Sequence, residues 1–343
     1  MQIMKKKSKA VRMTDVALRA GVSQATVSRV INGSSNINSK TRERVLDILR
    51  QTGYKSDIFN LLKNDVSCPR QISLLMCPLP EQTDPFALEY YALQAAGVRE
   101  VIEKRGGNLQ MHTLKPDASG LPSQLNADGI ILLGNPSWTL RQNLRERKIP
   151  YLVVASEIVG LSSEDIVTCN NYDSMFETCC YLARAGYRRI GMLISRHNFI
   201  RRSGVIAWHE QEQREVRPDD FRLAGNTETS SFIKVIYQWL ASKDLPDAVI
   251  VSSYDVADVF ETILRQQGIR VPEDIFLICF DHRPVNRLTR TCILTDPAEM
   301  GGRAALRLQE KIQNSDFQPV QILVPMRIYE KPESVKEIEK KAR

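Results

Sequence analysis

The sequence lacks the features of a membrane or exported protein. No apolar run in its 343 residues approaches the roughly 20 residues that span a bilayer. The first ten residues are basic and have no apolar core of the kind that a signal peptide needs. We therefore expect a cytoplasmic protein that makes no contact with a membrane.

Motifs for metals, cofactors and catalysis are also missing. The seven cysteines are scattered and contain no Cys-x-x-Cys pair, and the four histidines show no zinc-ligand spacing. There is no Gly-x-Gly-x-x-Gly, no phosphate-binding loop that ends in Gly-Lys, no Gly-x-Ser-x-Gly elbow and no His-Glu-x-x-His. We expect buried free thiols, no metal and no cofactor, and a binding protein is favoured over an enzyme.

Basic residues are concentrated at the N-terminal end. Residues 1–64 hold 13 Lys or Arg and 4 Asp or Glu, a net charge of +9, and because the whole chain carries +7 the remainder carries −2. A solvated basic tail would account for Lys5–Lys9 but not for basic residues spread through a segment with helical periodicity. The positive field of such a segment suits phosphate binding.

Residues 14–33, TDVALRAGVSQATVSRVING, have the pattern of two short helices joined by a sharp turn. Thr14 can cap the first helix, Gly21 can end it, and Ser23 is the natural N-cap of the second. A third helix is expected at about residues 39–52. The small helical unit is of the kind that fits the major groove of DNA.

The second helix is predicted to have one apolar and one polar face. The apolar positions recur at i, i+3 and i+4 and should pack inward: Val27, Val30 and Ile31. The polar positions should point outward: Gln24, Ala25, Ser28, Arg29 and Asn32.

These outward residue types are those that read base edges. Arg pairs with guanine, Gln or Asn with adenine, and Ala can touch the methyl group of thymine. Positions near the helix N-terminus lie closest to the bases, which favours Gln24, Ala25 and Arg29. The alternative is an ordinary three-helix bundle with a polar exposed face.

The N-terminal sequence closely resembles the DNA-binding headpiece of the lactose-repressor (LacI/GalR) family of bacterial transcription regulators. The resemblance covers residues 12–54 and includes NINSKTRERVLDILRQTGY after the helical pair. It implies that Gln24, Ala25 and Arg29 stand at base-reading positions. It also suggests phosphate contacts from Thr14, Ser23, Thr26, Ser28 and Asn32.

Residues 55–68 are expected to form the linker, which in that family becomes a hinge helix on operator DNA. A family leucine that wedges into the minor groove stands nine residues after the tyrosine that matches Tyr54, and Lys63 occupies this place. Leu61 or Leu62 could supply the wedge if the register shifts. Alternatively, the apolar side chains of the linker pack at a dimer contact.

From Gln71 onward, short apolar runs alternate with helical stretches, which predicts parallel sheets covered on both faces and divided between two subdomains. The expected strands are 72–77, 129–133, 151–155, 166–169, 190–195, 248–252 and 275–280. The expected helices are 86–104, 139–147, 173–185, 201–211, 231–241, 255–267 and 298–312. A cleft between the subdomains would be the natural ligand site.

This body resembles the effector domain of the same family, which is similar to a periplasmic sugar-binding protein with two Rossmann-like lobes and three crossovers. The resemblance spans residues 72–330 and implies effector contacts from Asn170, Arg201 and Asp281. Arg offers a fork of donors, and Asp or Asn accepts from hydroxyl groups. The alternative is a structural salt bridge between the arginine and the aspartate.

Some positions depart from the family pattern or admit two interpretations. Ser253 and Tyr254 stand where the family has an Asn-Asp pair, although Asp255 could cap the helix that follows. The connection over residues 108–127 is short for a crossover with a full helix. Aromatic and histidine side chains could contact a ligand, but core packing or an ordinary loop position is expected instead: Trp208, Trp239, His197 and His282.

The sequence therefore predicts an all-α helix-turn-helix headpiece followed by an α/β periplasmic-binding-protein-like domain. The expected domains are 1–54 (headpiece), 55–68 (hinge), 69–330 (two-lobed effector-binding and dimerisation domain) and 331–343 (charged tail). The expected function is a homodimeric, sequence-specific regulator, a repressor of a palindromic operator in double-stranded DNA, modulated by a sugar-like or sugar-acid-like small molecule. The alternative is a regulator whose lobes form a ligand-independent or protein-binding scaffold.

Overall fold

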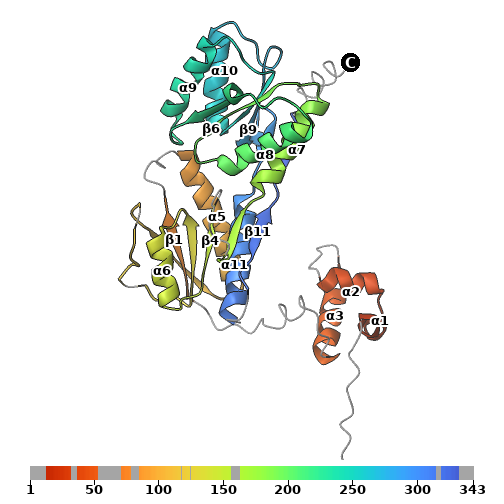
Figure 1. Ribbon diagram of the computed structural model, residues 1–343. Helices are drawn as coiled ribbons and strands as arrows, with labels where there is room; N and C mark the ends of the chain where they lie inside the picture. The colour runs from red at the N-terminus through yellow and green to blue at the C-terminus, as the bar shows by residue number, and fades with distance from the viewer. Residues whose placement is uncertain are drawn as a thin grey trace, which may run out of the picture. The chain divides into compact units, whose positions relative to one another are not determined.

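The computed structural model describes residues 13–31, 37–52, 71–78, 85–116, 118–123, 125–155, 163–313 and 318–331 (Figure 1). Two compact units make up the chain, 1–69 and 70–343, which we call the headpiece unit and the body. Among the described helices, none combines the length and the apolarity that crossing a membrane requires.

The headpiece unit contains α1 (Met13–Ala20), α2 (Gln24–Ile31) and α3 (Ser39–Thr52). Gly21 ends α1 with a φ of +62°, a left-handed conformation that glycine adopts without strain. Ser23 caps α2, because its Oγ accepts a hydrogen bond from the backbone N–H of Thr26 at 3.1 Å. Both turn residues therefore act as predicted.

The three headpiece helices share one small core. Its buried members come from all three helices and include the predicted inward positions of α2: Val16, Ala17, Ala20, Val27, Val30, Val45 and Leu49. The side chain of Ile31 lies outside the described residues. Thr14 is the second residue of α1 rather than its cap, because α1 already begins at Met13; a helix boundary read from sequence is uncertain by about one or two residues.

The first lobe of the body contains a six-stranded parallel sheet in the order β11-β5-β4-β3-β1-β2. The central strands are buried on both faces, as parallel sheets require. The strands are β1 (Gln71–Cys77), β2 (Asn108–Thr113), β3 (Gly129–Gly134), β4 (Tyr151–Val154), β5 (Ile166–Cys169) and β11 (Gln321–Val324).

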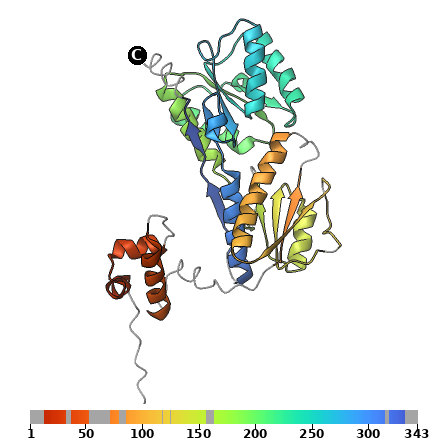
Figure 2. The ribbon, with the colours of Figure 1, turned by 180° about the vertical axis from the view of Figure 1, so that it is seen from behind.

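Helices cover the two faces of this first sheet unequally. The paired helices α5 (Pro85–Lys104) and α11 (Pro297–Gln313) pack on one face, and α6 (Trp138–Glu146) packs on the other (Figure 2). Between β2 and β3 the described residues form no helix. Leu114, Leu121 and Leu125 of this connection pack beside α6 instead, so a loop takes the place of a crossover helix.

The second lobe contains a six-stranded sheet in the order β12-β10-β9-β8-β6-β7, parallel except for β12. Helices α7 and α8 cover one face, and α9 and α10 cover the other. The strands are β6 (Ile190–Ser195), β7 (Phe221–Ala224), β8 (Ala248–Val251), β9 (Phe276–Asp281), β10 (Cys292–Leu294) and β12 (Arg327–Tyr329). The helices are α7 (Asn171–Arg184), α8 (Phe199–Gln211), α9 (Thr229–Ala241) and α10 (Tyr254–Gln266).

The chain crosses between the lobes three times, through α7 after β5, between β10 and α11, and between β11 and β12. The fold class is therefore as predicted, and each predicted strand and helix is present within a few residues of its expected bounds. Five strands were not predicted: β2, β7, β10, β11 and β12.

The cysteines that the structure describes are free thiols, and all but Cys180 are buried. Burial raises the pKa of the Cys77 thiol to about 12, so this thiol stays protonated at neutral pH. Cys279 and Cys292 lie opposite each other on β9 and β10, with their Sγ atoms 3.7 Å apart and no bond between them. Cys68 lies outside the described residues.

Candidate DNA-binding and ligand-binding sites

The N-terminal end of α2 is an open polar surface. Gln24 and Ser23 are exposed, and Thr26 and Ser28 are partly exposed. The first turn of α2 carries no acidic residue. Because the N-terminus of a helix bears a partial positive charge and free N–H groups, this surface suits the approach of phosphates and base edges.

The remaining predicted DNA contacts are described only in part. Ala25 and Arg29 belong to α2, and their side chains lie outside the described residues. Thr14 is exposed on α1. The other positions also lie outside the described residues: Asn32, Leu61, Leu62 and Lys63.

In the body, Arg201 is buried where the two lobes meet. It lies in the first turn of α8, and only 7% of its surface is exposed. Its Nε donates to Oδ1 of Asn171 at 2.8 Å, and its guanidinium group lies 3.9 Å from the centre of the Phe280 ring. Asn171 is the first residue of α7, so Arg201 is held at the point where the chain passes from the first lobe into the second.

Asp281 is the last residue of β9, and its carboxylate accepts hydrogen bonds from the loop that follows the strand. Its Oδ1 accepts from the backbone N–H groups of His282 and Arg283 at 2.6 and 2.7 Å. The Nε of Arg283 lies 3.1 Å from Oδ2 of Asp281, and Arg283 also pairs with Asp255. The alternative of a structural salt bridge between Arg201 and Asp281 is therefore not realised, because Asp281 pairs with Arg283. The pair forms within a single loop, because Arg283 follows Asp281 by only two residues.

Asn170 stands at the N-cap position of α7, but its side chain does not cap the helix. Its Nδ2 donates to Oδ2 of Asp173 at 2.9 Å. The amide is partly exposed. The three predicted effector residues thus come from the N-cap of α7, from α8 and from the end of β9, and Arg201 contacts the neighbours of the other two, Asn171 and Phe280.

The lobes touch through His282. Its Nε2 lies 3.6 Å from a carboxylate oxygen of Glu89 on α5, and its ring meets that of Tyr90 edge-on. Burial lowers the pKa of His282, although the carboxylates of Asp281 and Glu89 act in the opposite direction. The ring is therefore neutral at physiological pH. His197 is exposed.

The hydroxyl group of Tyr90 is directed into the first lobe. It lies 3.2 Å from Sδ of Met300 on α11 and 3.6 Å from Sγ of Cys169 on β5. Burial raises the pKa of Tyr90 well above its ordinary value. The tyrosine remains a neutral hydrogen-bonding group at the junction of the lobes.

The departure at Ser253 and Tyr254 has a structural explanation. Ser253, not Asp255, caps α10, because its Oγ accepts from the backbone N–H of Val256 and the first residue of the helix is Tyr254. The Tyr254 ring lies 4.0 Å from the guanidinium of Arg283 and 5.0 Å from that of Arg290. Tyr254 therefore helps to position Arg283, which is the arginine that pairs with Asp281.

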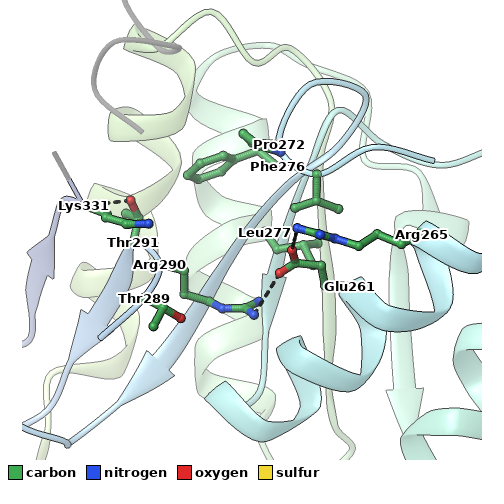
Figure 3. A pocket seen from close by; sticks show the side chains of 10 residues that line it. Glu261, Arg265, Pro272, Phe276, Leu277, Thr289, Arg290, Thr291 and Lys331 are labelled. Atoms are coloured by element: carbon green, nitrogen blue, oxygen red, sulfur yellow. Dashed lines mark hydrogen bonds and ion pairs between the residues drawn. The ribbon is translucent and has the colours of Figure 1, made fainter. Parts of the chain in front are cut away.

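Arg290 also lines a pocket of about 210 Å³ on the second lobe (Figure 3). Arg290 and Arg265 both point toward Glu261, with nitrogen-to-oxygen distances of 2.9 and 2.5 Å. Arg290 pairs with Asp258 as well. Carboxylates thus pair with both arginines of this pocket. Trp208 and Trp239, by contrast, are core residues, as expected, with 1% and 0% of their surfaces exposed.

Comparison with known families finds two matching regions. Residues 12–57 match the family described as bacterial regulatory proteins, lacI family. Residues 180–332 match a periplasmic binding protein-like domain. The first match contains all three helices of the headpiece unit, and the second contains most of the second lobe.

Curated relatives resemble almost the whole chain. Catabolite control protein A of Staphylococcus epidermidis is 24% identical over 338 residues, which cover 93% of this chain and 97% of that protein. The HTH-type transcriptional repressor CytR of Escherichia coli is 26% identical over 334 residues, which cover 90% of this chain and 92% of that protein.

Solved structures show the same fold. A complex of the transcriptional regulator CelR with cellobiose has a TM-score of 0.65 at 23% identity and covers 93% of this chain and 98% of its own. The lac repressor dimer bound to operator and the anti-inducer ONPF has a TM-score of 0.63 at 18% identity, with 94% and 98% covered. With the headpiece, the two-lobed body and regulators as relatives over nearly its full length, this chain belongs to the LacI family and is a DNA-binding transcriptional regulator, not an enzyme.

Proposed function

We propose that α2 reads operator bases in the major groove through Gln24, Ala25 and Arg29. The observation that carries this proposal is the capped, exposed N-terminal end of α2, above a core that fixes the opposite face of the helix. Gln and Arg can each make bidentate pairs with a base, and Ala leaves room for a thymine methyl group.

Side chains around the reading positions are assigned to the DNA backbone. Hydroxyl and amide groups donate to phosphate oxygens and set the register of the helix in the groove. These residues are Thr14, Ser23, Thr26, Ser28 and Asn32. In the linker, Leu61, Leu62 and Lys63 are assigned to the minor-groove side of the operator.

The whole protein acts as a cytoplasmic repressor and as a homodimer on a palindromic site. One headpiece contacts too few bases for strong discrimination, and two-fold symmetry doubles the number of contacts. Of the relatives, CytR is described as a repressor, and the lac repressor structure is a dimer on its operator. We assign DNA reading to residues 1–54, the hinge to residues 55–68, and effector binding and dimerisation to residues 69–330; residues 331–343 form the charged tail.

A small polar molecule bound between the lobes is assigned to Asn170, Arg201 and Asp281. Arg201 is held by Asn171 and Phe280, so its guanidinium group is already oriented before a ligand arrives. The related CelR is found in complex with cellobiose, which supports a sugar-like or sugar-acid-like effector. Binding changes operator affinity only if the effector prefers one lobe arrangement.

The experiment that tests the effector has two readouts. The protein is first screened by thermal shift against sugars, sugar acids and nucleosides, and a hit is then titrated into a complex with DNA enriched from a random pool. We expect a saturable rise in melting temperature and a change in DNA affinity of about 5–150-fold. Arg201→Ala should remain folded and lose the response, whereas Arg287→Ala, an exposed arginine of the second lobe, should keep it.

A second candidate, a scaffold that binds a protein partner without an effector, is favoured by one observation. Asp281, the expected acceptor for ligand hydroxyl groups, already accepts hydrogen bonds from His282 and Arg283. A neutral sugar would have to displace Arg283 to reach it. The scaffold would be supported if no compound in the screen changed the melting temperature of the protein and none altered its affinity for DNA.

A further inference from the structure

A second pocket lies at the opposite edge of the second lobe from the effector residues. Its volume is about 610 Å³, and it is lined by four arginines, His209, Glu215 and Asp220. Arg188 and Arg189 directly precede β6, whereas Asp281 ends the parallel strand β9. The starts and ends of parallel strands lie on opposite edges of a sheet, about 20 Å apart for six residues. The pocket is therefore separate from the junction of the lobes.

Two of its arginines form a neutral framework. The Nε of Arg189 donates to both carboxylate oxygens of Asp220, at 3.0 and 2.9 Å, and its Nη1 pairs with Asp244. Arg217 also pairs with Asp244, at 2.6 Å. These two guanidinium groups are thus balanced by two carboxylates, which fixes the wall of the pocket.

The other two arginines, Arg188 and Arg214, make no ion pair with any residue that the structure describes. Arg214 is nevertheless held in place, because its Nη1 donates to the carbonyl oxygen of Arg188 at 2.8 Å. Its guanidinium group lies 4.8 Å from the centre of the Trp208 ring. The pocket therefore presents one fixed and one exposed guanidinium group, opposed only by the exposed Glu215.

His209 adds a polar atom to the floor of the pocket. The residue is only 4% exposed, and its Nδ1 contacts the carbonyl oxygen of Val205 at 2.9 Å. A carbonyl oxygen can only accept, so Nδ1 carries the hydrogen and Nε2 is left for a ligand. Nε2 can accept a hydrogen bond from a phosphate oxygen that carries a hydrogen.

We propose that this pocket binds a small phosphate-bearing molecule through Arg188, Arg214 and His209, independently of any effector between the lobes. Guanidinium groups match phosphate geometry, and their hydrogen bonds to it are charge-assisted. The volume falls within the range of about 300–1,000 Å³ that is typical of small-molecule sites. In the pocket of Figure 3, by contrast, both arginines are paired with carboxylates.

Trp208 provides a direct readout, because it contacts Arg214 and His209. Inorganic phosphate and pyrophosphate are titrated into the full chain at constant ionic strength, with chloride as the reference anion, while tryptophan fluorescence is recorded. We expect a saturable change with pyrophosphate that Trp208→Phe abolishes. The headpiece unit contains no tryptophan, so phosphate bound there does not contribute to the signal.

Substitutions decide whether the pocket is the site. Arg188→Gln should weaken pyrophosphate binding at least about tenfold, since each charged hydrogen bond contributes roughly 1.5–3 kcal/mol. Arg214→Gln should do the same, and Arg188, being exposed, can be replaced without loss of the fold. Arg287→Gln removes an equal charge from an exposed position and should leave the midpoint unchanged. An equal response to chloride, or an unchanged midpoint in Arg188→Gln, would overturn the proposal.

Discussion

In the body, the single buried carboxylate of Asp165 pairs with two cationic side chains. Asp165 is 1% exposed and receives Nε of Arg307 at 2.7 Å and Nζ of Lys311 at 2.8 Å. Burial alone would raise the pKa of Asp165, but the hydrogen bonds and charges of Lys311 and Arg307 outweigh burial and lower it. This cluster ties α11 to the start of β5 in the first lobe.

Replacing this carboxylate should reduce stability in a pH-dependent way. Asp165→Asn leaves two cations without their shared anion, which should cost about 3 kcal/mol in free energy of unfolding at neutral pH. Because folding lowers the pKa of Asp165, its contribution is complete above the unfolded pKa of about 4 and is lost as pH falls through the folded value. The difference between wild type and variant, measured by denaturant unfolding, should therefore shrink below about pH 4.

Glu100→Gln provides the matched control for this experiment. Glu100 is an exposed carboxylate whose pKa is lowered by its hydrogen bond to Lys104. Exposed ion pairs of this kind contribute little, so the variant should unfold like wild type across the same pH range. A loss of stability in Asp165→Asn that stays constant from neutral to acid pH would contradict the role assigned to the Asp165 carboxylate.

For single residues, the place in the fold was easier to predict from the sequence than the side chain with which the residue pairs. The resemblance placed Arg201 and Asp281 at the ends of helix and strand that the structure brings to one junction. It gave no sign of Arg283, because the ion pair with Asp281 depends on the path of a loop rather than on periodicity. The contact between His282 and Glu89 joins residues from different lobes and could not be seen in local sequence.

At the scale of elements, α5 and α11 pack through glycines. A Cβ atom added to Gly301 would lie 1.9 Å from the carbonyl oxygen of Gln94, and one added to Gly97 would lie 1.9 Å from that of Ala298. Both contacts are with backbone, which cannot move aside without shifting a helix. The two helices run side by side in both views of the molecule (Figures 1 and 2).

Gly301→Ala should therefore destabilise the first lobe by about 1–3 kcal/mol through overpacking. Gly302→Ala is the control on the next residue, where the nearest atom to an added Cβ is 3.7 Å away. This second change should be neutral or stabilising by up to about 1 kcal/mol, because alanine favours a helix over glycine. Equal effects of the two substitutions on the denaturation midpoint would show that the close helix contact has no energetic importance.

Buried elements were predicted more completely than edge elements. Strands β3, β6 and β9 are buried along their whole length, so their sequences are nearly continuous runs of apolar residues. The edge strand β2 is mostly exposed, and its sequence NLQMHT carries no such run. The short strands β10 and β12 depend on pairing with distant partners, which a local pattern does not reveal.

At the scale of the whole molecule, function requires coupling between the headpiece unit and the body. Within the body, the lobes meet through His282, Glu89 and Tyr90, at the same junction as Arg201 and Asp281. A ligand that separates or tightens these contacts would change the arrangement of the lobes. A coupling free energy of about 1–3 kcal/mol is typical of such regulators.

The most direct test of the central claim measures base discrimination by α2. DNA enriched by the wild-type chain from a random pool is compared with DNA enriched by Gln24→Ala and Arg29→Ala. Each variant should lose about 1–3 kcal/mol of discrimination at one position of each half-site and retain salt-dependent, non-specific binding. Arg44→Ala, an exposed arginine on α3, should keep the wild-type sequence preference. If both α2 variants select the same sequence as wild type, with the same discrimination, α2 does not read the operator.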